Sequence, residues 1–289
     1  MNTIAIKRPL IKQGWLRVLL FCVFYFILIV ANSIPLIFLI KSIKGNTDNL
    51  EQLLNGEFLW LSLLIAAVSA LIAVFVFRKL IDRKSLGSMG FHISGYWSDA
   101  LSGFLLALSI LGIGSIILYF SKHLQWTDII FSGRDLFIEL GMLLIVAFYE
   151  EMVFRGYILN NLMESFNKWI ALIISAILFT LFHIDNPSIN AIPFVNIFLA
   201  GILLGINYVY TRNLWFAILF HFGWNFFQGP VLGYKISGFN LPTLLQTELK
   251  GDLLLTGGDF GFEGSIFSTG LIIIAILLLY RVYEKKKQH

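Results

Sequence analysis

Polar side chains that could carry out chemistry interrupt long apolar stretches of this sequence at three places. They are Glu150, Glu151, Arg155, His183, His221 and Asn225. An ionisable side chain within a membrane-spanning segment costs several kcal/mol to insert, so each such residue is a functional candidate. The types and spacing of these residues narrow the reactions that they could carry out.

Helical spacing separates the two adjacent glutamates. Residues four positions apart share a helix face, whereas neighbours are rotated by about 100°. Glu151 and Arg155 are therefore predicted to form an ion pair that offsets the cost of burying both. Glu150 points elsewhere and must face a polar group on another helix. His221 and Asn225 are also four apart and form a polar stripe, and Phe179 lies on the same face as His183.

Hydrolysis is the reaction that these side chains suit. A buried carboxylate can act as a general base on water, and a nearby histidine can hold that water and carry its proton. A second histidine and an asparagine amide can donate hydrogen bonds to a developing oxyanion. Glu150, His183, His221 and Asn225 thus predict cleavage of an amide or ester by activated water. No serine or cysteine is evidently paired with either histidine, which disfavours a covalent nucleophile.

Zinc binding is the alternative that the same residues leave open. Two histidines, one glutamate and a water form a known catalytic zinc set. The ligands would be His183, His221 and either Glu150 or Glu151. The sequence lacks a local H-E-x-x-H element, and we favour the reaction without a cofactor.

The composition indicates a membrane protein whose solvent is the lipid bilayer. Of the 289 residues, 58% are hydrophobic and 13% are charged, against about 25% charged in globular domains. No nucleic-acid-binding motif is present, so nucleic acid is not an expected partner. The single cysteine, Cys22, excludes an intrachain disulfide and is expected to be a packing residue.

Apolar stretches predict an all-α, polytopic bundle of about eight membrane-spanning helices. A span needs about 20 mostly apolar residues. The candidates are 16–40, 58–78, 98–120, 136–163, 169–184, 194–210, 214–228 and 265–283. Counting along alternating helices brings the candidate residues to a similar depth. We expect one membrane domain, with supporting helices in residues 1–130 and a reactive core in residues 131–289.

The distribution of basic residues predicts the orientation of these helices. Fourteen of the 21 lysines and arginines fall in segments on the same side as the N-terminus. They are Lys7, Arg8, Lys12, Arg17, Arg78, Lys79, Arg83, Lys84, Lys168, Arg212, Arg281 and Lys285 to Lys287. By the positive-inside rule, both termini are expected in the cytoplasm of a multi-pass cell-membrane protein. The acidic outer loop 229–263 is expected to lie over the bundle as a lid.

At these residues the sequence resembles the CAAX prenyl protease 2 and bacteriocin-processing family of intramembrane proteases, known as CPBP or Abi. The family motifs E-E-x-x-x-R, F-x-x-x-H and H-x-x-x-N match Glu150 to Arg155, Phe179 to His183 and His221 to Asn225. The glycine-rich stretch 257–264 also resembles bacterial members.

The resemblance implies an eight-helix bundle with a cavity open to the membrane. Eukaryotic and archaeal relatives remove the last three residues of prenylated CAAX proteins. Applied to this chain, the resemblance implies that Glu150 and His183 activate water and that His221 and Asn225 bind the oxyanion. It also implies that Glu151 and Arg155 support the site. The family is often labelled metalloprotease, although a metal-free glutamate mechanism suits the asparagine better.

The substrate class and two rival functions remain open. A short apolar chain without appended domains is typical of bacteria, where the substrate would be another peptide or protein, such as a peptide bacteriocin. A proton-coupled transporter could use Glu150, His183 and His221 as a relay, although no paired repeat supports it. A non-catalytic scaffold or immunity protein would use the polar residues only for packing.

Overall fold

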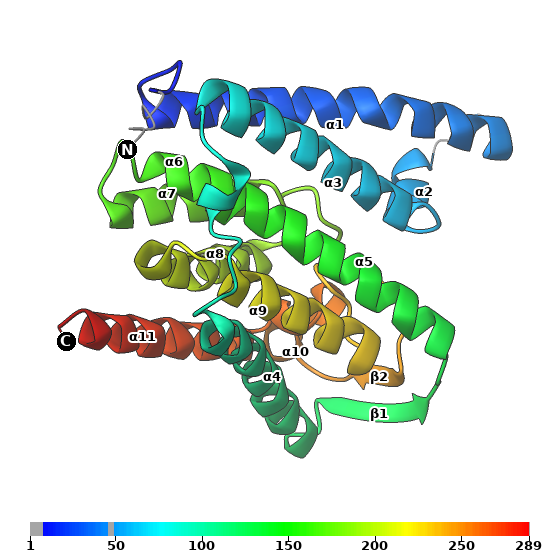
Figure 1. The fold of residues 1–289 in the computed structure, drawn as a ribbon. Coiled ribbons are helices and arrows are strands. Elements are labelled where there is room, and N and C mark those ends of the chain that lie inside the picture. The colour runs from blue at the N-terminus through cyan, green and yellow to red at the C-terminus, as the bar shows by residue number, and fades with distance from the viewer. Residues whose placement is uncertain (1–7, 46–48, 289) are drawn as a thin grey trace.

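The computed structural model describes residues 8–45 and 49–288, and it is a bundle of long helices (Figure 1). Its α-helices and strands are α1 Gly14–Lys44, α2 Leu50–Asn55, α3 Leu59–Val76, α4 Trp97–Phe120, β1 Leu124–Ile129, α5 Gly133–Glu151, α6 Asn160–Leu162, α7 Lys168–Leu181, α8 Ala191–Thr211, α9 Trp215–Phe226, β2 Leu245–Leu249, α10 Leu253–Thr256 and α11 Ile266–Gln288. Three π-helical segments, Phe77–Ile81, Met152–Leu159 and Phe227–Val231, continue α3, α5 and α9.

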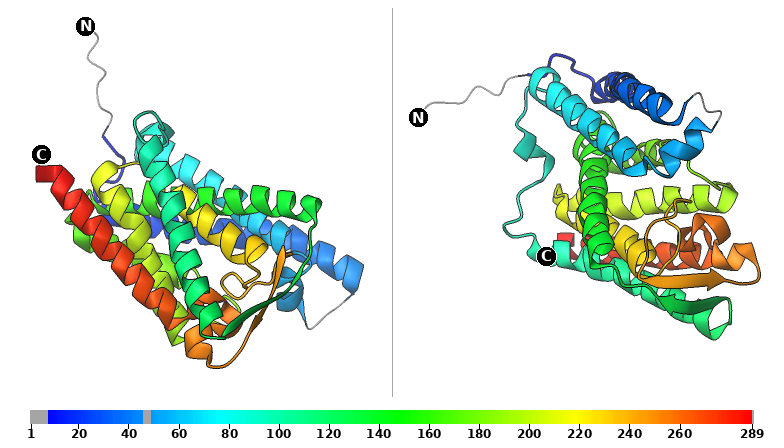
Figure 2. Two further views of the ribbon diagram at one scale, coloured as in Figure 1. Left: turned by 90° about the horizontal axis from the view of Figure 1, so that it is seen from below. Right: turned by 90° about the vertical axis from the view of Figure 1, so that its right-hand side faces the viewer.

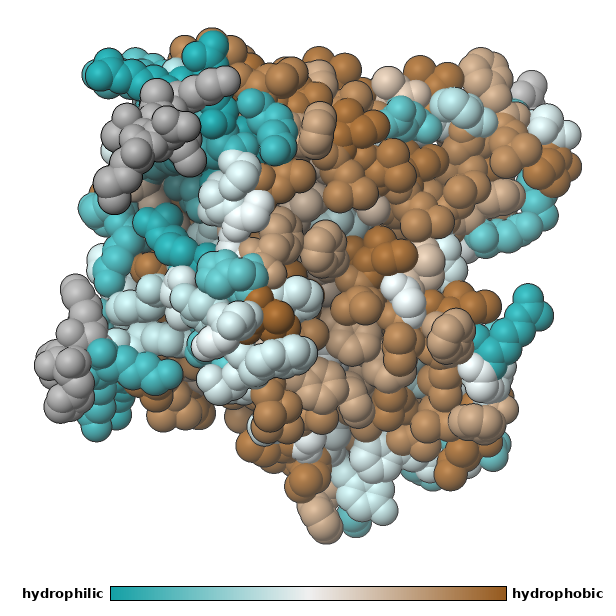
Figure 3. Space-filling model, in the orientation of Figure 1, coloured by the Kyte–Doolittle hydropathy of each residue, from teal (hydrophilic) through white to brown (hydrophobic). Residues whose placement is uncertain are grey.

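The predicted all-α membrane bundle is confirmed. Five helices within the described residues are long and apolar enough to cross a membrane: Gly14–Lys44, Leu59–Ile81, Trp97–Phe120, Ala191–Thr211 and Ile266–Lys286. Large apolar side chains such as Phe26, Leu101 and Leu277 are more than half exposed on these helices. Such a surface requires lipid around it, and Figure 3 shows the broad hydrophobic face.

The remaining predicted spans are the helices that carry the candidate residues. α5 contains Glu150 and Glu151, α7 is shorter at 14 residues and carries Phe179, and α9 has 12 residues and carries His221 and Asn225. These helices can be shorter or more polar than a lipid-facing span because they pack among other helices. Those neighbours, and not lipid, surround their polar groups. Eight spans were predicted, and the structure supports five by length and apolarity.

The helices form layers around α5, α7 and α9, which carry candidate residues (Figures 1 and 2). α1 and α3 pack side by side above α5, α7 packs against α8, and α8 in turn contacts α11. α4 packs along α9. At Gly103 of α4, an added Cβ would lie 2.3 Å from the carbonyl oxygen of Phe216 in α9, so the close approach requires glycine. α4, which lies within residues 1–130, therefore fixes the position of the helix that bears His221 and Asn225.

A short two-stranded antiparallel sheet joins the loop between α4 and α5 to the segment between α9 and α11, and the sequence did not predict it. β1 pairs with β2 from Leu124 opposite Leu249 to Ile129 opposite Leu245, with an irregularity between Trp126 and Asp128. The predicted lid, residues 229–263, is therefore tied at its middle to the loop between α4 and α5.

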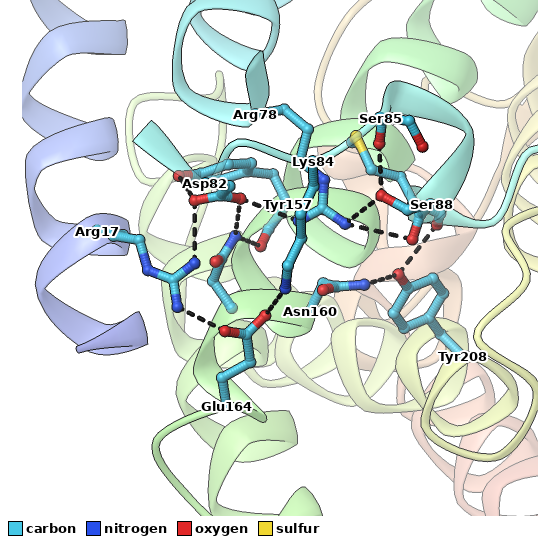
Figure 4. Close-up of polar contacts among 12 residues, drawn as sticks. Arg17, Arg78, Asp82, Lys84, Ser85, Ser88, Tyr157, Asn160, Glu164 and Tyr208 are labelled. Atoms are coloured by element: carbon cyan, nitrogen blue, oxygen red, sulfur yellow. Dashed lines mark hydrogen bonds and ion pairs between the residues drawn. The ribbon is translucent and has the colours of Figure 1, made fainter. Parts of the chain in front are cut away.

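A cluster of buried charges joins the first helices to the core (Figure 4). Asp82, which is fully buried, lies between two arginines: its Oδ1 is 3.0 Å from Arg17 Nη1 and its Oδ2 is 2.9 Å from Arg78 Nη1. Tyr157 and Asn161 also donate hydrogen bonds to its carboxylate, at 3.4 and 3.3 Å. We call Arg17, Arg78, Asp82, Tyr157 and Asn161 the Asp82 cluster.

The Asp82 cluster contains two of the basic residues counted in the prediction of orientation. Arg17 and Arg78 were assigned to inner segments, and both side chains are buried and paired with Asp82. Arg17 lies near the start of α1, and Arg78 lies in the π-helical segment that continues α3. Both side chains point into the protein, where the Asp82 carboxylate offsets their charge. Lys84, by contrast, is partly exposed and pairs with Glu164, which also accepts a hydrogen bond from Arg17. Lys7 lies outside the described residues.

Candidate active site

A cavity of about 220 Å³ lies among α3, α5, α7, α8 and α9. Its wall is mostly apolar, with side chains such as Leu63, Val146 and Leu204. The polar side chains that line it are Glu150, His183, Asn186, Asn196, His221, Asn225, Ser237 and Glu263. The volume is several times the roughly 30 Å³ that one water molecule occupies in the liquid. The cavity thus has room for both water and a group of a substrate.

Glu150 faces both histidines across this cavity. Its Oε2 lies 3.7 Å from His183 Nε2 and 3.9 Å from His221 Nε2. This oxygen is buried and has no hydrogen-bond partner among the described residues, while Oε1 accepts a long bond of 3.4 Å from Tyr149. Polar atoms separated by slightly more than a hydrogen bond are commonly bridged by water. Glu150 and His183 thus lie at a separation that one water molecule can bridge.

Glu151 pairs with Arg155 as the helical spacing predicted. Arg155 Nη1 lies 2.8 Å from Glu151 Oε1, and both side chains are buried. Arg155 also donates to the carbonyl of Gly201 at 3.1 Å, and its guanidinium stacks over the Phe179 ring, 4.5 Å from the ring centre. The pair thereby connects α5 to α7 and α8.

Glu151 has a second contact that the sequence did not reveal. His221 Nδ1 lies 2.9 Å from the same Oε1 of Glu151. A carboxylate oxygen can only accept here, so Nδ1 carries the proton and Nε2 is turned toward Glu150. Glu151 is therefore more than a partner for Arg155, because it also sets the orientation of the His221 ring.

His183 lies in the turn that follows α7, two residues beyond Leu181, and not within the helix as predicted. Its Nδ1 donates to the carbonyl of Phe179 at 2.7 Å. The Phe179 ring also packs against it, with ring centres 4.6 Å apart. Both histidines thus use Nδ1 to hold the ring and present Nε2 to Glu150. Asn225 lines the same cavity one helical turn after His221.

Glu263 is a cavity residue that the sequence motifs did not single out. It stands just before α11, and its Oε1 accepts hydrogen bonds from the backbone N–H and the hydroxyl of Ser237, the latter at 2.8 Å. Its Oε2 accepts from Trp224 Nε1 at 3.2 Å. Burial raises the pKa of Glu263 above its usual range, while these donors and the nearby His183 act in the opposite direction. Its place in the glycine-rich stretch 257–264 was the available signal.

The zinc alternative concerns the placement of His183, His221 and Glu150. Among the described residues, no group of three or more His, Cys, Asp or Glu side chains is placed so that it could hold a metal ion. The chemistry of His183, His221 and Glu150 would suit zinc, but their present placement does not form such a set.

Replacing Glu151 should harm the folded protein more than replacing Glu150. Glu151→Ala leaves Arg155 buried without its carboxylate, and breaking a buried ion pair from one side costs about 3–5 kcal/mol. Glu150→Ala removes a carboxylate whose Oε2 accepts no hydrogen bond from the described residues. We expect lower membrane yield and a lower unfolding temperature in detergent for Glu151→Ala. Equal yields of the two variants, with equal loss of activity, would contradict this division of roles.

Comparison with known proteins agrees with the resemblance seen in the motifs. Residues 132–227 match a family described as Rce1-like, type II CAAX prenyl endopeptidase. This segment contains Glu150, Glu151, Arg155, Phe179, His183, His221 and Asn225. The Bacillus subtilis (strain 168) protein named "Putative membrane peptidase YdiL" is 27% identical over 233 residues, which cover 75% of this chain and 87% of that protein.

Proposed function

We propose that this chain, a member of the Rce1-like group of CAAX prenyl endopeptidases, is an intramembrane peptidase that cleaves a peptide bond with activated water. The proposal rests on one observation: Glu150 Oε2 lies within 4 Å of Nε2 of both His183 and His221, at 3.7 and 3.9 Å, in the cavity. Three groups able to exchange protons converge there on a volume large enough for water and a substrate carbonyl.

The first step forms a bond between water and the carbonyl carbon. Glu150 takes a proton from the water as its oxygen attacks, and His183 Nε2 orients the water from the other side. The carbon–nitrogen bond then breaks, and the proton held by Glu150 or His183 passes to the leaving amine. Since Nδ1 of His183 is committed to Phe179, only its Nε2 takes part in the transfer.

His221 and Asn225 supply the oxyanion site in this proposal. The amide of Asn225 donates directly. For His221 Nε2 to donate, the ring must carry a second proton, and the carboxylate of Glu151 at 2.9 Å is the partner for that charge. The role of Glu151 is thus to hold both Arg155 and His221 in place for the reaction.

The orientation follows the basic residues that remain at the membrane surface. The beginning of α1 and the end of α11 lie at the same end of the bundle (Figure 1), where Figure 3 shows hydrophilic residues gathered. We place this end in the cytoplasm of a bacterial cell, with β1 and β2 on the outer side. Peptide or protein substrates reach the cavity from the membrane or the outer surface.

A cleavage assay with purified protein in lipid nanodiscs tests the function. We expect cleavage of apolar peptides at the same rate with 1,10-phenanthroline, which binds zinc, and with its non-chelating 1,7 isomer. Loss of cleavage with the chelating isomer alone, restored by added zinc, would replace the metal-free mechanism with the zinc version. Absence of any cleavage, together with peptide or proton transport by liposomes containing the protein, would favour the transporter.

A further inference from the structure

We propose that Glu263 sets the charge preference of the substrate, so that the cavity favours a basic side chain near it and disfavours an acidic side chain or a free carboxyl terminus. This inference rests on the proposed peptidase function and concerns the substrate class of the same site. It uses a carboxylate outside the segment that matches the family, which ends at residue 227.

The hydrogen bonds of Glu263 are those of an ionised carboxylate. Three donors point at its two oxygens: the N–H and hydroxyl of Ser237, and the indole N–H of Trp224. An ionised carboxylate only accepts, whereas a protonated one must also donate. None of the three donors is itself a charged group, so the negative charge is held in place without being cancelled.

The position of this charge is fixed by the surrounding backbone. The backbone carbonyl of Glu263 accepts a hydrogen bond from Asn196 of α8 at 2.7 Å. Gly261, with φ +97°, lies against the chain at Lys235, where an added Cβ would be 1.9 Å from the carbonyl oxygen. Only glycine fits this approach, which brings Glu263 beside Ser237. The carboxylate therefore belongs to the wall of the cavity.

Among the described residues, the cavity wall contains no lysine or arginine to balance Glu263. Arg155, the buried cation that follows Glu150 in the chain, is already paired with Glu151. Lys235, two residues before Ser237, pairs with Asp259 at 2.6 Å and does not line the cavity. With Glu150 and Glu263 both facing inward, the wall carries two carboxylates, balanced only by histidines.

Substrate selection follows from this charge balance. A free α-carboxylate or an acidic side chain brought into the cavity would be buried near two carboxylates and without a lysine or arginine partner, which is unfavourable. A lysine or arginine side chain would instead meet Glu263. Removal of a short carboxyl-terminal peptide, as in CAAX processing, would place a free carboxylate near the scissile bond, so we expect this chain to cleave internal bonds near basic residues.

Matched peptides provide the test. One apolar peptide is made with lysine, glutamine or glutamate at each position flanking the scissile bond, with both termini blocked, and once more with a free carboxyl terminus. Cleavage rates and binding affinities, the latter by fluorescence polarisation, are measured with wild-type protein and with Glu263→Gln. Asp259→Asn is the matched control, since it removes a charge from the same loop but lies 76% exposed outside the cavity.

At one flanking position, we expect the wild type to bind and cleave the lysine peptide about tenfold or more better than the glutamate peptide. The reason is that charges a few ångströms apart interact strongly in a partly desolvated site. Glu263→Gln should largely abolish this ratio, whereas Asp259→Asn should keep it. Ser237→Ala, which removes one donor but leaves the charge, should also keep it. If Glu263→Gln lowered the cleavage rate equally for all peptides, Glu263 would be purely structural and the proposal would be overturned. A wild-type protein that binds all the peptides with equal affinity would also overturn it.

The binding measurement separates this inference from the proposed function. A wild-type protein that binds lysine peptides preferentially but cleaves none would overturn the peptidase and leave the charge preference of the cavity standing. A protein that cleaves all peptides equally well would support the peptidase and overturn the role of Glu263.

Discussion

Replacing Glu150 by glutamine should lower kcat for peptide cleavage by about 10²–10⁴-fold, the usual contribution of a general acid or base. The glutamine amide has the shape of the carboxylate but cannot take a proton from water. The fold should tolerate the change, because Glu150 Oε2 accepts no hydrogen bond from the described residues and Oε1 accepts only a long one from Tyr149. The measurement is the steady-state cleavage rate in nanodiscs, with the unfolding temperature recorded for the same sample.

Two variants show whether the loss is chemical. Glu248→Gln removes an exposed carboxylate of β2 and should leave the rate unchanged. Asn225→Ala removes a proposed oxyanion donor and should cost about 10²–10³-fold in kcat. If Glu150→Gln cleaves at the wild-type rate with intact folding, water activation by this carboxylate is ruled out, and the polar groups of the cavity must serve another purpose.

Replacing Asp82 by alanine should produce the largest loss of stability. The substitution leaves Arg17 and Arg78 buried with no carboxylate between them, although Arg17 retains its bond to Glu164. Breaking a buried ion pair from one side costs about 3–5 kcal/mol. In a two-state unfolding transition this would lower the melting temperature by on the order of 10 °C. Thermal unfolding in detergent, followed by tryptophan fluorescence, provides the measurement.

The matched control is Glu57→Gln. Glu57 pairs with Lys44 at 2.9 Å, but both side chains are largely exposed, and such surface pairs contribute about 0–1 kcal/mol. A melting temperature for Asp82→Ala equal to that of Glu57→Gln would mean that the Asp82 cluster does not hold the first helices to the core.

Helical phase explains why much of the site could be predicted. Contacts four residues apart depend only on the local helix, so the pairing of Glu151 with Arg155 was correct. The eight apolar stretches likewise located helices, because the length of an apolar stretch can be read from the sequence alone. The partner of His221 was beyond such reasoning, since helical phase shows which face a residue is on and not which helix packs there.

Contacts made by loops were missed for a related reason. Glu263 reaches the cavity only because glycines with positive φ, Gly257 and Gly261, fold the preceding loop against residue 235. The pairing of β1 with β2 joins segments more than 100 residues apart, and Asp82 pairs with Arg17, which lies 65 residues away in the chain. The glycine-rich stretch 257–264 was a local signal for the first contact, but the pairing of β1 with β2 and that of Asp82 with Arg17 have no local sequence pattern that predicts them.

The π-helical segment Met152–Leu159 lies between two polar centres, the cavity at Glu150 and the Asp82 cluster. A π-helical turn contains one residue more than an α-helical turn. Before it, Glu150 faces the cavity and Glu151 contacts His221; within and after it, Tyr157 and Asn161 face Asp82. Deleting one residue there would rotate one set by about 100° relative to the other. The extra residue acts as a spacer that sets the register, because a uniform α-helix of the same span could not serve both centres at once.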